Sequence, residues 1–119
     1  MSSTSASRQA PPRIVVTLGD PSGIGAEVTL RALTSRPRPR ASFLLVGDPG
    51  SVEDTAARIG LTMDFPRVGP EAAAVGDIPT RGFPVLLPAG SAPMKRSERR
   101  PGKPTLAGAR MAYASLLAA

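Results

Sequence analysis

The amino-acid sequence predicts an α/β protein with a mostly parallel sheet, and three observations support this class. Apolar runs at residues 14–18, 42–46 and 83–87 are nearly continuous, as strands covered on both faces require. Helix-forming stretches separate or follow these runs. The tripeptide Gly-Asp-Pro directly follows two of them, at Gly19 and at Gly47, which is typical of successive βα units. In parallel sheets of this kind, ligands bind outside the carboxyl ends of the strands.

The first βα unit is predicted to consist of a strand over Arg13–Leu18, a glycine loop and a helix over Ile24–Leu33. Pro37 and Pro39 follow this helix and cannot continue it. Residues 1–12 have no long apolar stretch, so we expect a disordered lead-in rather than a signal peptide. The folded domain is therefore expected to begin at the first strand.

The second unit begins with a predicted strand over Ser42–Val46. Ser51 is the expected N-cap of the following helix, with Asp54 in the third position of a variant capping box. The helix is expected to end near Ile59, with Gly60 as the residue that leaves the helical path.

The remaining sequence has weaker local signals. We expect a strand over Leu61–Phe65 and a loop over Val68–Gly82. A further strand, which begins near a proline, is expected over Phe83–Leu87, followed by a long polar connection over Ala89–Pro104. Thr105 is the expected cap of a last, alanine-rich helix over Leu106–Ala119. Because the sequence stops within this helical pattern, we expect a truncated lobe rather than a complete α/β domain.

The composition excludes several kinds of chemistry. The 119 residues contain no cysteine and no histidine, which removes disulfides, thiolate sites and the commonest general base and metal ligand. No carboxylate cluster is evident either, so neither a catalytic residue nor a metal site is assigned to this chain. The apolar fraction of 41% is sufficient for the core of one domain or part of one.

The positive charge is concentrated in two segments. The net charge is +6, and much of it lies in residues 36–40 and 95–103. Solvated loop charge is the simpler interpretation, although Lys95, Lys103 and the loop arginines could also attract a phosphorylated small-molecule substrate. Nucleic acid is not an expected partner, because no aromatic cluster or reading module accompanies the charge. No segment is long and apolar enough to cross a membrane, and we expect a cytoplasmic protein.

The loop after the first strand is the candidate binding site. A glycine loop between a strand and a helix start leaves backbone N–H groups where an anion can bind. Six of its residues are the candidate substrate- or cofactor-binding residues, namely Gly19, Asp20, Pro21, Ser22, Gly23 and Gly25. The alternative is a tight βα turn that needs glycine for geometry alone, with Asp20 bonded to backbone N–H groups.

Two general phosphate-binding patterns do not fit this loop. A P-loop requires Gly-Lys-Ser/Thr at the helix start, whereas Gly25 is followed by Ala26 and Glu27. The Rossmann pattern matches at two glycines, but Val28 occupies the position of the third small residue.

The segment Thr-Leu-Gly-Asp-Pro-Ser-Gly-Ile-Gly-Ala-Glu at residues 17–27 resembles a specific signature. It is similar to the amino-terminal motif of the 4-hydroxythreonine-4-phosphate dehydrogenase family, Thr-x-Gly-Asp-Pro-Ala/Ser-Gly-Ile-Gly-Pro-Glu. The sequence departs from this motif at Ala26, where proline is usual. Supporting similarities follow in the family's order, at Leu44–Asp48, at Ala57–Leu61, and at Pro101–Thr105 leading into Gly108. The resemblance spans most of residues 13–119.

The resemblance implies a fold, an activity and partners. Members have the isocitrate/isopropylmalate dehydrogenase type of fold, so residues 13–119 would form the amino-terminal part of an α/β/α lobe. They are homodimers that use NAD and a divalent metal to oxidise 4-hydroxythreonine 4-phosphate with decarboxylation, in the synthesis of pyridoxal phosphate. Their metal ligands are histidines, which this chain lacks, so the isolated chain is expected to be inactive.

Two alternatives remain open at this stage. A related dehydrogenase of 4-phosphorylated threonate or erythronate would carry the same motif. A non-catalytic, truncated anion-binding module would retain the loop without the chemistry.

Overall fold

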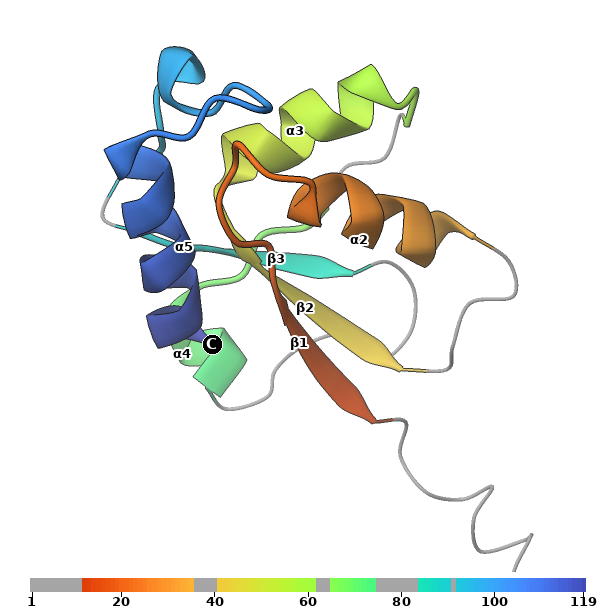
Figure 1. Cartoon of the computed structure of the whole chain (residues 1–119). Helices are drawn as coiled ribbons and strands as arrows, with labels where there is room; N and C mark the ends of the chain where they lie inside the picture. The colour runs from red at the N-terminus through yellow and green to blue at the C-terminus, as the bar shows by residue number, and fades with distance from the viewer. Residues whose placement is uncertain (1–11, 36–40, 62–64, 75–83, 91) are drawn as a thin grey trace, which may run out of the picture.

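The computed structural model describes residues 12–35, 41–61, 65–74, 84–90 and 92–119 and contains a parallel sheet (Figure 1). Its strands lie in the order β1-β2-β3, with the bounds Arg13–Thr17, Ser42–Gly47 and Val85–Pro88. Val15 lies opposite Leu44, and Leu45 lies opposite Leu86. The predicted α/β class with a parallel sheet is therefore confirmed.

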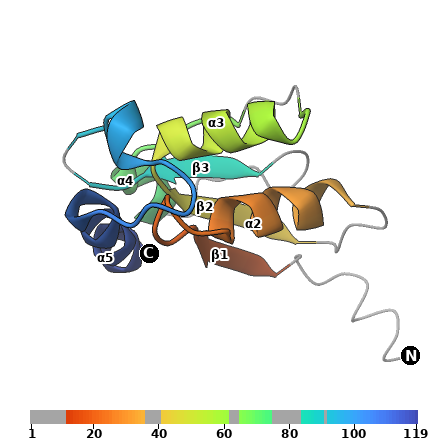
Figure 2. The ribbon, with the colours of Figure 1, turned by 45° about the horizontal axis from the view of Figure 1, so that its top comes forward.

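Helices cover both faces of this sheet. They are α2 (Gly25–Thr34), α3 (Pro49–Arg58), α4 (Pro70–Ala74), the 3₁₀ turn η1 (Arg96–Glu98) and α5 (Leu106–Ala118). Helices α2 and α3 contact each other on one face, whereas α5 packs against β2 and β1 on the other face (Figure 2). None of the helices in the described segments is long and apolar enough to cross a membrane.

The side chains of β2 alternate between two apolar cores. Leu45 contributes to the core beneath α2 and α3, together with Leu30 and Val52. Leu44 and Val46 point the other way, into the core that includes Met111 of α5 and Met94. Because β2 is paired on both edges and covered on both faces, Leu45 and Val46 have an exposed fraction of 0%. The apolar run predicted for a strand buried on both faces is confirmed for β2.

Strand β1 differs from that expectation because it lies at the edge of the sheet. Ile14 is 39% exposed and Val15 is 46% exposed, although their sequence resembles that of a buried strand. Only the β2 side of β1 is paired among the described residues.

Several apolar side chains of α5 are also exposed, namely Leu106, Tyr113, Leu116 and Leu117.

Most predicted helix ends are confirmed. Gly60 has a positive φ of 79°, and its N–H and that of Leu61 donate to carbonyls of the last turn of α3. The hydroxyl oxygen of Thr105 accepts a hydrogen bond of 3.0 Å from the N–H of Gly108, as the predicted cap of α5 requires.

The predicted N-cap of α3 is wrong. The helix begins at Pro49, a residue favoured in the first helical position, and Asp48 is the cap. The N–H of Ser51 donates to Asp48 Oδ2 at 2.9 Å, so Ser51 lies inside the first turn. Asp54 closes no capping box, since its carboxylate instead binds Arg99.

Other predictions lie partly outside the described residues. The prediction of a loop over 68–82 is wrong at Pro70–Ala74, because these residues form the short helix α4. Residues 75–82 of the predicted loop are not described. Of the strand predicted over 61–65, residues 62–64 are not described, but Arg67 nearby forms a parallel bridge with Leu86. The connection over 89–104 is more structured than predicted, because it contains η1 and the buried Met94.

The core makes a stability prediction. Leu45→Ala removes a fully buried side chain from the central strand and should lower the free energy of unfolding by about 2–5 kcal/mol. Leu117→Ala is the matched control, because Leu117 is 70% exposed, and should change it by less than about 0.5 kcal/mol. Urea denaturation followed by circular dichroism measures both values. Equal effects of the two substitutions would contradict the assignment of the core.

Candidate functional site

Three segments meet at the carboxyl end of the sheet (Figure 1). They are the loop that joins β1 to α2, the turn that joins β2 to α3, and the stretch that leads into α5. The N–H of Gly102 donates to the carbonyl of Ser22 at 2.7 Å, and the N–H of Met94 donates to Asp48 Oδ1 at 3.1 Å. The ends of two strands are therefore tied to a part of the chain that is distant in sequence.

Two glycines of the first loop are required by its geometry. Gly19 has a φ of 76°, in the left-handed region that side chains other than glycine rarely adopt. A Cβ at Gly25 would collide with the carbonyl oxygen of Leu18, since the start of α2 packs against the end of β1. The tight βα turn is thus an observed feature of the loop, and it is compatible with ligand binding there.

Asp20 is the central side chain of this loop. Its Oδ1 atom accepts hydrogen bonds of 2.8 Å from both the N–H and the hydroxyl of Ser22, and its carbonyl accepts one of 2.9 Å from the N–H of Gly23. These are the bonds of a turn aspartate. The carboxylate is only half-buried, so it is also accessible from solvent.

The carboxylate of Asp20 also lies against the first turn of α5. A Cβ at Gly108 would collide with it, which means that this approach requires glycine at position 108. The positive end of the α5 dipole stabilises a negative charge in that place. Sequence reasoning gave Gly108 no structural role, because no local pattern relates it to a loop more than eighty residues earlier.

The second Gly-Asp-Pro has a different role from the first. Asp48 is 1% exposed. Its Oδ2 atom accepts bonds from the N–H and the hydroxyl of Ser51, and its Oδ1 atom accepts the bond from Met94. Both oxygens are satisfied by protein groups, so Asp48 is a structural residue.

The start of α2 is left without a side-chain cap. Ile24 precedes the helix, makes no capping hydrogen bond and is 72% exposed. By contrast, α3 is capped by Asp48 and α5 by Thr105. The N–H groups in the first turn of an uncapped helix are free to bind an anion, and the helix dipole favours one there. The uncapped start of α2 is therefore the strongest ligand-binding feature in and around the six predicted site residues.

The described residues do not provide a metal site. No group of three or more His, Cys, Asp or Glu side chains lies together in these segments. With no histidine or cysteine in the whole sequence, the chain lacks the donor set that a transition metal prefers. The fit between this chain and the divalent metal implied by the family resemblance is therefore poor.

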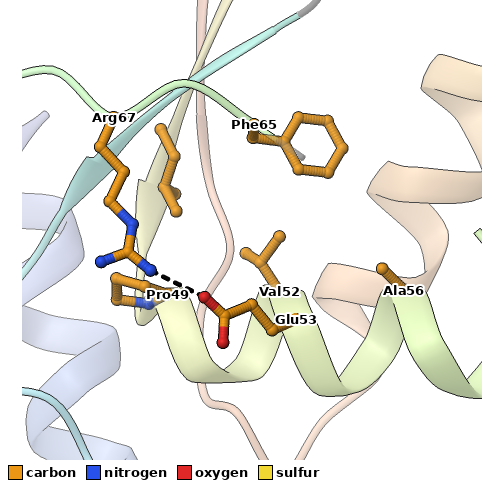
Figure 3. Close-up of a pocket in the computed structure, with 7 residues that line it drawn as sticks. Pro49, Val52, Glu53, Ala56, Phe65 and Arg67 are labelled. Atoms are coloured by element: carbon orange, nitrogen blue, oxygen red, sulfur yellow. Dashed lines mark hydrogen bonds and ion pairs between the residues drawn. The ribbon is translucent and has the colours of Figure 1, made fainter. Parts of the chain in front are cut away.

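A pocket of about 240 Å³ with a mixed polar and apolar lining lies elsewhere, between α3 and the segment that includes Phe65 (Figure 3). Val52, Ala56 and Phe65 line it, and an ion pair of 2.7 Å between Glu53 and Arg67 crosses its rim. None of its lining residues belongs to the Gly19–Gly25 loop. Both side chains of the ion pair are largely exposed, so the pair contributes little to stability.

The fold and the loop together define a class of protein: a parallel α/β lobe with a glycine loop and an uncapped helix start at the carboxyl edge of its sheet. No family model matches the chain. Curated relatives do match, and they are named 4-hydroxythreonine-4-phosphate dehydrogenase. That of Methylorubrum populi is 40% identical over 108 residues, which is 89% of this chain and 29% of the relative. That of Xanthobacter autotrophicus is 40% identical over 111 residues, which is 92% of this chain and 30% of the relative.

The chain is thus homologous to the 4-hydroxythreonine-4-phosphate dehydrogenases, and it spans about 30% of the length of these relatives. The resemblance seen in the sequence motif is confirmed. A solved structure from Salmonella typhimurium, assigned as a 4-hydroxythreonine-4-phosphate dehydrogenase, matches with a TM-score of 0.60 at 23% identity. The match covers 89% of this chain and 32% of that one, and it supports the fold.

The two aspartates should differ when they are replaced. Asp48→Ala removes a buried cap and leaves the N–H of Met94 unpaired, which should cost about 2–4 kcal/mol of unfolding free energy. Asp20→Ala removes bonds within a half-buried turn and should cost about 1 kcal/mol. Thermal and urea unfolding measure the difference. A larger loss for Asp20→Ala would reverse the structural roles assigned to the two residues.

Proposed function

We propose that this chain is the amino-terminal part of an NAD- and metal-dependent dehydrogenase that oxidises 4-hydroxythreonine 4-phosphate. The identity of 40% to curated relatives of that name supports the proposal. The observation that carries it is the uncapped start of α2, which lies within the family motif at the carboxyl edge of the sheet. The relatives are named dehydrogenases, so the reaction class proposed for the whole protein is oxidoreduction.

In this proposal the Gly19–Gly25 loop lines the ligand cleft. The N–H groups in the first turn of α2 bind an anionic group of the substrate or cofactor. Asp20, held by Ser22 and placed against Gly108, positions a polar group of the ligand with the accessible part of its carboxylate. NAD accepts the hydride when it is bound.

The described residues of this chain offer no suitable donor set for the divalent metal. We propose that its ligands come from other parts of the whole enzyme. The further features of the proposal are a role in pyridoxal phosphate synthesis, a homodimeric assembly and a cytoplasmic location. A substrate such as 4-phosphorylated threonate or erythronate would present the same anionic group to the loop.

A carboxylate placed at the start of α2 tests the anion site. Ile24→Asp puts a negative charge beside the free N–H groups and should weaken binding of 4-hydroxythreonine 4-phosphate by about tenfold or more. Binding is measured from the amide shifts of Gly25–Glu27 in NMR titrations. The unfolding free energy should stay constant or rise by about 0.3–1 kcal/mol, since the charge suits the helix dipole.

The matched control is Ala32→Asp, which adds the same charge on the exposed surface near the other end of α2. It should change the affinity by less than about twofold, because the added charge lies roughly 12 Å further along the helix. Equal weakening by both variants, or no saturable shifts in the unmodified chain, would contradict an anion site at this helix.

The isolated chain also makes a prediction about turnover. The 119-residue chain should form no NADH from NAD and 4-hydroxythreonine 4-phosphate, with or without Zn²⁺ or Mg²⁺, because its sequence has no histidine and its described segments hold no carboxylate cluster. Absorbance at the NADH band measures this directly. Metal-dependent turnover by the chain alone would show that its own side chains bind the metal.

A further inference from the structure

A second feature of the molecule gathers positive charge. A hollow of about 560 Å³ lies between the last turns of α3 and the segment that contains η1. Its walls include four arginines, a single carboxylate and a hydroxyl, namely Arg58, Arg96, Arg99, Arg100, Asp54 and Ser97. Arg58 comes from the helix, and the other three arginines come from a segment about forty residues later, so folding alone brings them together.

Asp54 is the only carboxylate among the described residues that line this hollow, and it is already paired. Arg99 Nε donates to Asp54 Oδ2 at 2.7 Å, and Arg99 Nη1 donates to the carbonyl of Met94 at 2.8 Å. The side chain of Arg99 is 14% exposed and packs against Gly50, where a Cβ would come within 2.8 Å of its Cζ. The hydrogen bond with Asp54 raises the pKa of Arg99 despite partial burial, so this guanidinium stays charged.

The other three arginines have no such partner in the part of the chain that the structure describes. Arg58, Arg96 and Arg100 are exposed, and none of them forms an ion pair with any residue that the structure describes. Three like charges around one concavity repel each other, and an anion that bridges them relieves that repulsion. Guanidinium groups match the geometry of phosphate oxygens through paired N–H donors.

We propose that this arginine hollow is a binding site for a phosphorylated small molecule that carries two or more negative charges. Its volume falls in the range of small-molecule sites, roughly 300–1,000 Å³. Arg99 and Asp54 form the fixed wall, and Arg58, Arg96 and Arg100 supply the donors. The lining residues that the structure describes include no aromatic side chain, which favours a small ligand over single-stranded nucleic acid, whose bases need stacking partners.

The hollow is separate from the candidate cleft. None of its lining residues belongs to the Gly19–Gly25 loop, so the inference goes beyond the proposed dehydrogenase function and does not depend on it. The two sites are near each other along one stretch of chain. Pro101 lines the hollow, and the next residue, Gly102, is bonded to Ser22 of the loop.

Calorimetric titration of the 119-residue chain with inorganic pyrophosphate at low ionic strength tests the proposal. The double variant Arg96→Gln/Arg100→Gln should bind pyrophosphate about tenfold more weakly or worse. The matched control Arg13→Gln/Arg110→Gln removes the same charge from exposed positions on β1 and α5, and its affinity should stay within about threefold. The exchanged arginines are exposed in both variants, and amide spectra confirm that each variant is folded.

Three outcomes would overturn the proposal. They are the absence of saturable binding to the unmodified chain, an equal loss in the two double variants, and tighter binding of a single-stranded oligonucleotide that depends on the same arginines. The charge-preserving variant Arg96→Lys/Arg100→Lys should still lose several-fold in affinity, because lysine cannot form the paired contacts. Because Ile24→Asp blocks the start of α2, Arg96→Gln/Arg100→Gln should weaken pyrophosphate binding as strongly in an Ile24→Asp background as in the unmodified chain, so failure of this proposal and failure of the proposed function are distinguishable.

Discussion

The buried carboxylate of Asp48 is the interaction on which the rest of the structure depends. Asp48 directly follows the central strand β2, and its carboxylate caps α3 and accepts a hydrogen bond from the N–H of Met94. It thereby joins β2, α3 and the stretch before η1 at one point. Met94 in turn buries its side chain beside Val46 and Met111, so the polar and apolar contacts of this corner support each other. Arg99 adds a second link between the same segments, because it binds the Met94 carbonyl and packs against Gly50 at the start of α3.

Both candidate ligand sites follow from that anchor. The stretch fixed at Met94 continues through η1 to Gly102, which binds the loop after β1, and then enters α5. The carbonyl of Met94 also holds Arg99, and Arg99 forms the fixed wall of the arginine hollow. The stretch that Asp48 binds at Met94 thus connects the glycine loop, the start of α5 and the clustered arginines.

Local sequence signals predicted what depends on neighbouring residues. The three strands of the sheet, the helix ends at Gly60 and Thr105, and the glycine turn were predictable, because backbone preferences and apolar runs determine them. The exposure of β1 was not, since edge and central strands share the same apolar composition. The contact between Asp20 and Gly108 and the meeting of Arg58 with Arg100 depend on long-range packing, which no periodicity encodes. The cap of α3 was missed because Ser51 and Asp48 are both good caps, and Pro49 decides between them.

The close approach of Asp20 to Gly108 has an evolutionary consequence. A mutation that adds a side chain at position 108 would displace the carboxylate, so it would persist only with a compensating change in the loop or a shift of α5. Positions 20 and 108 should therefore vary together among related sequences, even though one belongs to a binding loop and the other to a helix. Selection on the loop would then extend to a helix residue that lies outside it.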